Sequence, residues 1–281
     1  MQVRRCRDAD EFLDRAGEFL AAREAEHNLI LGLSGRLRDA PHTYGEEQPY
    51  FAVAEEGGRV VGAAMRTPPH NLILSELDDE RALGALAEDV RAAFSELPGV
   101  LGPKTAVERF VSLWGAPGQL VISQRAHCAE RVTPPAGVPG RMRRYEDADR
   151  ELALRWLDAF VAEALPRGSP ESTEAILEHR LADADGGFVF WEDAEPVSLA
   201  GYGGRTPNGI RIGPVYTPPE LRRRGYATAL TAALTQRLLD AGPRFCFLFT
   251  DLANPTSNSI YAAVGYRPVT DLDQWAFTRS R

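Results

Sequence analysis

The stretch VYTPPELRRRGYATAL, Val215–Leu230, decides the fold of this chain of 281 residues. It predicts a strand that runs into a basic turn and then a helix, and the turn carries the pattern Arg222-x-x-Gly225-x-Ala227. A helix N-terminus has unpaired N–H groups and the positive end of the macrodipole, so it binds anions such as a pyrophosphate. Gly225 permits positive φ, and residues 222–224, all arginine, supply counter-charge. The alternative interpretation is a solvated basic turn before a surface helix.

The next segment favours the anion-binding interpretation. FCFLFT, Phe245–Thr250, is a continuous apolar run that is typical of a buried strand. After it, Asn254 and Pro255 are expected to break the chain, and Ser257 or Asn258 is expected to cap a short helix.

This order of strand, basic turn, helix, strand and Asn…Tyr-x-x-x-Gly-Tyr segment resembles the GNAT superfamily of acetyl-CoA-dependent N-acetyltransferases. Arg222, Gly225 and Ala227 match its pyrophosphate-binding motif A. The residues that match its motif B are Asn254, Asn258, Tyr261, Gly265 and Tyr266. Gly265 is expected to end the motif B helix, and the resemblance is expected to extend over 141–281.

The resemblance implies acetyl-CoA as a cosubstrate. The strand Val215–Thr217 would pair with the pantetheine arm, the amides of 223–228 would surround the pyrophosphate, and two asparagines would steady the pantetheine or the motif B loop. The cofactor-binding residues implied in this way are Val215, Tyr216, Thr217, Arg222, Arg223, Arg224, Gly225, Tyr226, Ala227, Thr228, Asn254 and Asn258.

The same resemblance implies one catalytic residue, Tyr261, which would lie near the sulfur and protonate the leaving thiolate. A phenol with a pKa of about 10 is a suitable acid for a thiolate of similar basicity. The alternative is a tyrosine that only packs the helix.

The general base and the acceptor pocket stay open at this stage. Asp251, Glu163 and an ordered water are the candidates for the base, although Asp251 could brace the loop and Glu163 could be solvated. Residues expected on the acceptor side are Trp156, Phe160, Glu163, Tyr202 and Tyr216, and core packing explains Trp156 and Phe160 equally well. No metal site is expected, because the histidines are dispersed without ligand spacing.

The chain also contains an internal duplication. VRRCRDAD begins at Val3 and MRRYEDAD at Met142, a spacing of 139 residues, and Gly62 and Gly201 have the same spacing. A constant offset over separated matches predicts two similar modules in tandem.

The two copies differ in chemistry. Where the second half has its basic turn, the first has SELDDERALGALAEDV, Ser75–Val90, with acidic residues at 78–80, and apolar residues around Val111 stand opposite Tyr261. Negative charge suits a helix N-terminus but repels a pyrophosphate. We therefore expect a degenerate GNAT-like domain at 1–133, a linker at 134–140 and a catalytic GNAT domain at 141–281. An unrelated α/β domain is the alternative for the first half.

The expected fold class is α/β (α+β), with two tandem GNAT-like domains that each have a mixed, mostly antiparallel sheet flanked by helices. A net charge of −8 argues against a nucleic-acid partner and favours a cationic acceptor. No apolar run or leader indicates a membrane or secretion, and three scattered cysteines indicate no disulfide framework, so the cytoplasm is expected.

The expected function is transfer of an acetyl group from acetyl-CoA to a primary amine of a small molecule or peptide by direct attack. A backbone N–H of the Val215–Thr217 strand would polarise the carbonyl. A non-catalytic acyl-CoA-binding or sensing protein is one alternative, and an aminoacyl-tRNA-dependent transferase, which the acidic balance disfavours, is another. The first half is expected to pack, to shape the acceptor pocket or to form a homodimer.

Overall fold

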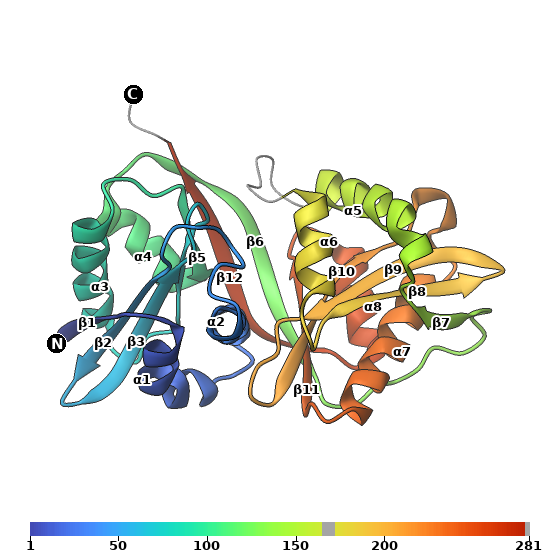
Figure 1. The fold of residues 1–281 in the computed structure, drawn as a ribbon, viewed down its shortest axis with the longest axis horizontal. Coiled ribbons are helices and arrows are strands. Elements are labelled where there is room, and N and C mark those ends of the chain that lie inside the picture. The colour runs from blue at the N-terminus through green and yellow to red at the C-terminus, as the bar shows by residue number, and fades with distance from the viewer. Residues whose placement is uncertain (165–171, 279–281) are drawn as a thin grey trace. The chain divides into compact units, whose positions relative to one another are not determined.

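The computed structural model describes residues 1–164 and 172–278, and for Thr256 it describes the backbone only. Two compact units are present, and Figure 1 shows the elements of each. Unit 1 comprises Met1–Arg125 with Thr270–Arg281, and unit 2 comprises Ala126–Val269. In the described ranges no helix has the length and apolar character needed to cross a membrane.

Unit 1 contains a sheet with strand order β1-β2-β3-β4-β5-β12-β6. Its elements are β1 (Gln2–Cys6), α1 (Ala9–Ala21), α2 (Asn28–Asp39), β2 (Tyr50–Glu56), β3 (Arg59–Arg66), β4 (Leu72–Leu74), α3 (Glu80–Ala93), β5 (Gly99–Pro103), α4 (Lys104–Trp114), β6 (Gly118–Ala129) and most of β12 (Arg267–Phe277). β4 and β5 pair in parallel, and the other pairs for which a register is known are antiparallel. Alternate residues of β2 enter two cores, one under α1 and α2 and one under α3 and α4, so both faces of the sheet are covered.

Unit 2 repeats this plan with strand order β6-β11-β10-β9-β8-β7. Its elements are β7 (Arg141–Arg144), the 3₁₀ turn η1 (Asp147–Asp149), α5 (Arg150–Ala164), α6 (Thr173–Leu181), β8 (Gly187–Asp193), β9 (Glu195–Gly203), β10 (Gly209–Tyr216), η2 (Pro219–Leu221), α7 (Tyr226–Asp240), β11 (Phe245–Asp251) and α8 (Pro255–Val264). One core lies under α7 and α8, and the other lies under α5 and α6. The fold class expected from the sequence is confirmed.

An arginine–glutamate pair occupies the same place in the two units. Arg4 stands opposite Val53 in the β1–β2 register and its guanidinium lies 3.7 Å from Glu55. Arg143 stands opposite Phe190 in the β7–β8 register, and its Nε donates to the carboxylate two residues further on, Glu192, over 2.5 Å. Equal register and equal chemistry support the duplication.

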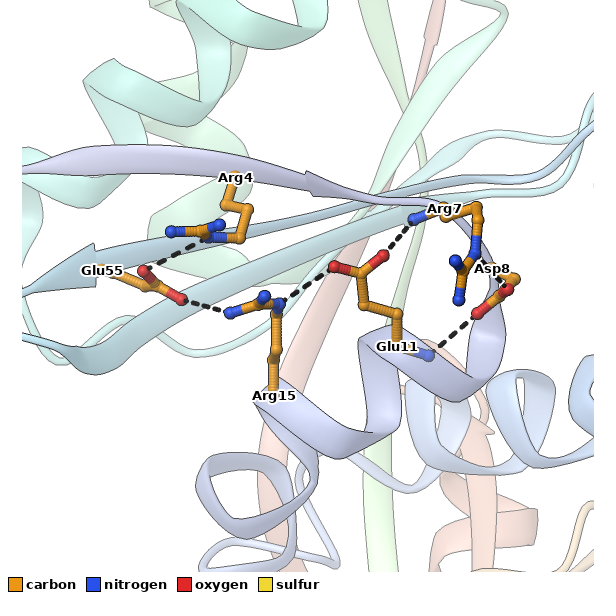
Figure 2. Close-up of polar contacts among 6 residues, drawn as sticks. All are labelled: Arg4, Arg7, Asp8, Glu11, Arg15 and Glu55. Carbon is orange, nitrogen blue, oxygen red and sulfur yellow. Dashed lines mark hydrogen bonds and ion pairs between the residues drawn. The ribbon is translucent and has the colours of Figure 1, made fainter.

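In unit 1 this pair belongs to a chain of charges that joins β1, α1 and β2, shown in Figure 2. Arg15 lies 3.6 Å from Glu55 and 3.2 Å from Glu11, and the Glu11 carboxylate accepts the amide N–H of Arg7. Asp8 caps α1 by accepting the Glu11 amide over 2.9 Å. The N-terminus of α1 is thus held by its own carboxylates.

The bounds of the two compact units differ from those of the domains expected from the sequence, 1–133 and 141–281 with a linker at 134–140. That domain division stays a prediction. β12, which is last in the sequence, pairs antiparallel with β5 of the first half, from Leu272 opposite Pro103 to Ala276 opposite Gly99. Conversely, the end of β6 from Ala126 belongs to unit 2. Strand pairing over a long sequence separation leaves no local trace in a sequence, so the halves of a duplication need not coincide with the compact units.

The β5–β12 pairing generates a test at Gly99. A Cβ at this residue would lie 2.1 Å from the carbonyl oxygen of Trp275, so Gly99→Ala is expected to destabilise the fold by about 1–3 kcal/mol in urea denaturation. The matched control is Gly84→Ala in α3, where a Cβ meets nothing within 4 Å and helix propensity predicts a gain of about 0.5–1 kcal/mol. Equal effects of the two substitutions would contradict the pairing.

Candidate functional site

The site begins where β10 leaves β11. The two strands pair in parallel only from Gly209 opposite Phe245 to Arg211 opposite Phe247. β10 then continues to Tyr216 with β9 as its neighbour. On the side of β11 the backbone of Ile212–Val215 therefore has no strand partner and is open to a ligand, because strand groups without a ladder need one. The Tyr216 carbonyl already accepts from the Ser198 hydroxyl over 2.9 Å.

A β-bulge lies in the open part of β10, between Ile212 and Val215. Gly213 has a φ of 146°, a region that favours glycine. Ile212 and Val215 pack on the α7 face, although regular alternation would place residues three apart on opposite faces. The bulge therefore directs Tyr216 to the α5 face, where its ring lies 6.3 Å from that of Trp156.

The basic turn is wound so that it presents backbone amides. Arg223 and Gly225 have φ values of 63° and 84°, and alternating left-handed residues turn successive N–H groups toward one concavity. α7 begins at Tyr226 without a side-chain cap, and its first helical bond runs from the Ala229 amide to the Gly225 carbonyl. The amides of 226–228 thus precede the helical ladder and can donate to an anion.

Arg222 makes structural contacts at the end of β10, and the counter-charge role expected for it stays a prediction. Its Nε donates to the Thr217 carbonyl over 2.9 Å and another nitrogen donates to the Glu163 carboxylate over 2.6 Å. It also lies 5.7 Å from the centre of the Tyr216 ring. Arg222 ties the end of β10 to α5, and all three arginines, 222–224, are exposed to solvent.

Gly225 faces the linker segment. A Cβ at this residue would lie 2.9 Å from Cγ2 of Val138, and the Pro139 carbonyl accepts a bond from the Trp191 indole. The linker therefore packs against the basic turn at Gly225, a contact that was not predicted from the sequence.

Tyr226 contributes its amide to the turn, while its side chain is used elsewhere. Its hydroxyl donates to Asp193 over 2.6 Å, and this hydrogen bond raises the tyrosine pKa. The bond fixes the start of α7 to the β8–β9 turn.

The motif B loop corrects one expectation from the sequence. The cap of α8 is Asn254, whose side chain accepts the Ser257 amide over 3.1 Å, and Pro255 is the first helical residue. The expectation of Ser257 or Asn258 as the cap was wrong, because proline suits the first helical position and asparagine before it satisfies the open amides. The left-handed Gly265 ends the helix as expected.

Asn258 and Asp251 hold this loop together. The Asn258 amide donates to the carbonyls of Asp251 and Asn254, over 3.3 and 3.0 Å. The Asp251 carboxylate accepts the Ala253 amide over 2.8 Å. Asp251 thus braces the turn, which was the alternative to its role as a base.

Tyr261 is half-buried on α8, and its ring meets that of Tyr266 edge to face at 6.1 Å. Burial raises the pKa of Tyr261 to about 12. No hydrogen bond joins its hydroxyl to another residue within the described ranges, so the hydroxyl is available to a ligand.

The residues expected on the acceptor side divide between the two faces of the sheet. Trp156 lies 5.7 Å from Phe190 and 6.3 Å from Tyr216, and Glu163 reaches the same region through Arg222. Phe160 is half-buried one turn along α5. Tyr202 packs on the α7 face, where Arg237 lies 5.7 Å from its ring, so it does not join the others.

In unit 1 the corresponding helix start is filled by its own carboxylates. Asp79 caps α3 by accepting the Arg81 amide over 2.8 Å, and the bonds from Arg81 lower the Asp79 pKa to about 2. Glu80 pairs with Arg109, and Asp78 with Arg23. An anion at this helix would meet negative charge.

No metal-ligand set occurs within the described ranges: no group of three or more His, Cys, Asp or Glu is placed to hold an ion. No role was predicted from the sequence for Val138, which lies next to Gly225, or for His127, whose Nε2 lies 3.0 Å from the Thr250 hydroxyl. Neither residue belongs to a motif with regular spacing.

Comparisons with known proteins agree with this geometry. Residues 152–266 match the acetyltransferase (GNAT) family, and this segment is a GNAT domain. The whole chain has the tandem GNAT fold: it is similar to a tandem GNAT protein from the clavulanic acid biosynthesis pathway, with 15% identity, full coverage of both chains and a TM-score of 0.58. The resemblance found in the sequence is confirmed.

Two further solved structures are similar to this chain. A Drosophila protein is 15% identical, with 98% of each chain covered and a TM-score of 0.70. A GCN5-related N-acetyltransferase from Kribbella flavida is 18% identical, covering 93% of this chain and 96% of its own, with a TM-score of 0.60. No curated protein matches the chain.

The contact between Gly225 and Val138 can be tested by a double-mutant cycle. Gly225→Ala is expected to cost about 1–3 kcal/mol, from backbone strain at φ 84° and from the clash with Val138. Combined with Val138→Ala, its cost in thermal or urea unfolding should fall below the sum of the single costs by at least about 0.5 kcal/mol. Strictly additive costs would show that the linker does not contact the turn.

Proposed function

We propose that this protein transfers the acetyl group of acetyl-CoA to a primary amine of a small molecule or peptide. The GNAT domain supports an N-acetyltransferase function in general terms. The observation that carries the finer proposal is the open edge of β10 next to the uncapped start of α7. This edge and these amides suit a ligand with an extended amide-containing arm and a pyrophosphate.

In this proposal the pyrophosphate lies on the amides that follow Arg223, and the exposed Arg223 and Arg224 give the surrounding charge. The pantetheine arm adds as a strand to the edge of β10 at Val215 and Tyr216 and continues past Thr217, the residue after β10, whose carbonyl accepts from Arg222. Asn254 and Asn258 act through the loop that they hold, which was one of the two roles open for them.

The proposed reaction is direct attack. The amine nitrogen forms a bond to the thioester carbonyl carbon, whose oxygen is polarised by a β10 amide, and the C–S bond then breaks. Tyr261 donates its proton to the departing sulfur, the nitrogen releases its extra proton to an ordered water, and Tyr261 regains a proton from that water. With a raised pKa the phenol stays protonated at neutral pH, as an acid must.

For the base we propose an ordered water. Asp251 accepts a backbone amide in its own turn, and Glu163 is paired with Arg222. Both carboxylates are thus used for structure, and the acceptor ammonium loses its proton to solvent before attack.

Unit 1 has no acyl-CoA site in this proposal, because carboxylates fill the start of α3. One cosubstrate per chain follows. The acceptor is cationic in keeping with the net charge of −8, and nucleic acid is not a partner. Cys6, Cys128 and Cys246 form no disulfide, which fits the cytoplasm.

Calorimetry with acetyl-CoA tests the cofactor site. We expect one site per chain, and Arg223→Glu should weaken binding about tenfold, because it places a negative charge beside the pyrophosphate. Arg59→Glu, an exposed residue at the start of β3, changes the net charge equally and should leave the affinity unchanged. Two sites would mean that unit 1 is competent, and equal weakening by both variants would remove the local role of Arg223.

Tyr261→Phe tests the chemistry. Release of the CoA thiol should be measured with a polyamine, an amino sugar, an aralkylamine and a lysine peptide as acceptors. With the best acceptor, kcat should fall by roughly 10²-fold while acetyl-CoA affinity is retained. Because burial raises the Tyr261 pKa to about 12, ionisation of this group should not lower the wild-type rate up to about pH 10. Tight binding without turnover on any amine would instead indicate a sensing protein.

A further inference from the structure

A buried histidine reaches the motif B loop through two hydrogen bonds. His127, at the end of β6 in unit 2, is 5% exposed, and its Nε2 lies 3.0 Å from the hydroxyl of Thr250. Thr250 is 3% exposed near the end of β11, and its hydroxyl lies 2.6 Å from Oδ1 of Asn258 in α8. Three elements are thereby joined through side chains alone.

The direction of these hydrogen bonds follows from Asn258. Its Nδ2 faces two backbone carbonyls, those of Asp251 and Asn254, so its Oδ1 faces Thr250. An amide oxygen only accepts, so the Thr250 hydroxyl must donate its proton to Asn258. Toward His127 that hydroxyl can only accept, and Nε2 of His127 therefore carries the hydrogen.

We propose that His127 is a positioning residue for Tyr261, acting through Thr250 and Asn258. Asn258 and Tyr261 are three residues apart in α8 and so lie on the same face of the helix. Fixing the Asn258 amide at both ends fixes the rotation of α8 about its axis, and with it the direction of the Tyr261 ring. The inference rests on the proposed function for its catalytic consequence only.

The residue types in the hydrogen-bonded series His127–Thr250–Asn258 support a positioning role over simple packing. An apolar side chain would fill the space of His127, but it would leave the Thr250 hydroxyl without a donor and allow it to rotate away from Asn258. The donor is provided by β6, which belongs to the first half of the sequence, whereas Thr250 and Asn258 belong to the second.

The test compares three variants with a matched control. His127→Leu and Thr250→Val each remove a hydrogen bond of the series from His127 to Asn258. Both should lower kcat with the best amine about tenfold, while acetyl-CoA affinity stays within about twofold. His127→Gln keeps an N–H donor and should recover most of the loss. Thr231→Val is the control, since Thr231 is fully buried and its hydroxyl has no hydrogen-bond partner among the described residues, so kcat should not change.

A second comparison separates positioning from a general loss of structure. In a Tyr261→Phe background, His127→Leu should cause no further fall in kcat, because the residue through which it acts is already gone. A further tenfold fall, or an equal fall in Thr231→Val, would overturn the proposal.

Failure of the proposed function gives a different pattern. If the wild type releases no CoA with any amine, the relay is tested by hydrogen exchange of the α8 amides, Pro255–Val264. Faster exchange in His127→Leu and Thr250→Val, but not in Thr231→Val, would support the positioning of α8. Unchanged exchange in all three would overturn it.

Discussion

The short parallel pairing of β10 with β11 is the constraint on which the site depends. Because the register ends at Arg211 and Phe247, the rest of β10 has a neighbour on one side only. The bulge at Gly213 then sets which face each later side chain meets, and the turn after the strand brings uncapped amides to the start of α7. Extending the ladder to Tyr216 would close the edge that we propose for the pantetheine arm.

The two units show how little distinguishes a helix start that can hold an anion from one that cannot. α3 and α7 are corresponding helices, and each follows the corresponding strand of its unit, β4 or β10. At α3 a carboxylate, Asp79, accepts the amide that a ligand would need. At α7 the cap is a glycine without a side-chain acceptor, so the amides remain open. The macrodipole is the same in both, and the occupant differs.

Local signals in the sequence were sufficient for the turn, the buried strand and the end of α8. Gly225 and Gly265 have the left-handed geometry that their positions predicted, and Phe245–Asp251 is a strand. The cap of α8 was misplaced because Pro255 was taken as a breaker, although proline is favoured in a first helical turn. Here two local rules compete, and only the structure decides between them.

Other features had no local signal at all. Three contacts join residues far apart in the sequence: the ion pair of Arg222 with Glu163, the packing of Val138 beside Gly225, and the hydrogen bond of His127 with Thr250. Tyr202 and Tyr216 look alike in sequence, but the bulge and the strand register place them on opposite faces of the sheet. These contacts and orientations depend on which distant segments pair in the fold. Periodic patterns of apolar residues in a single sequence do not reveal that pairing.

The place of β12 in unit 1 also bears on how the chain is made. β12 lies between β5 and β6 in the sheet order, yet it is translated after the elements of unit 2. During translation the sheet of unit 1 must therefore stay incomplete while all of unit 2 is synthesised. The nascent chain carries an open edge at β5 for this whole interval, an edge that invites pairing with other strands until the C-terminal residues arrive.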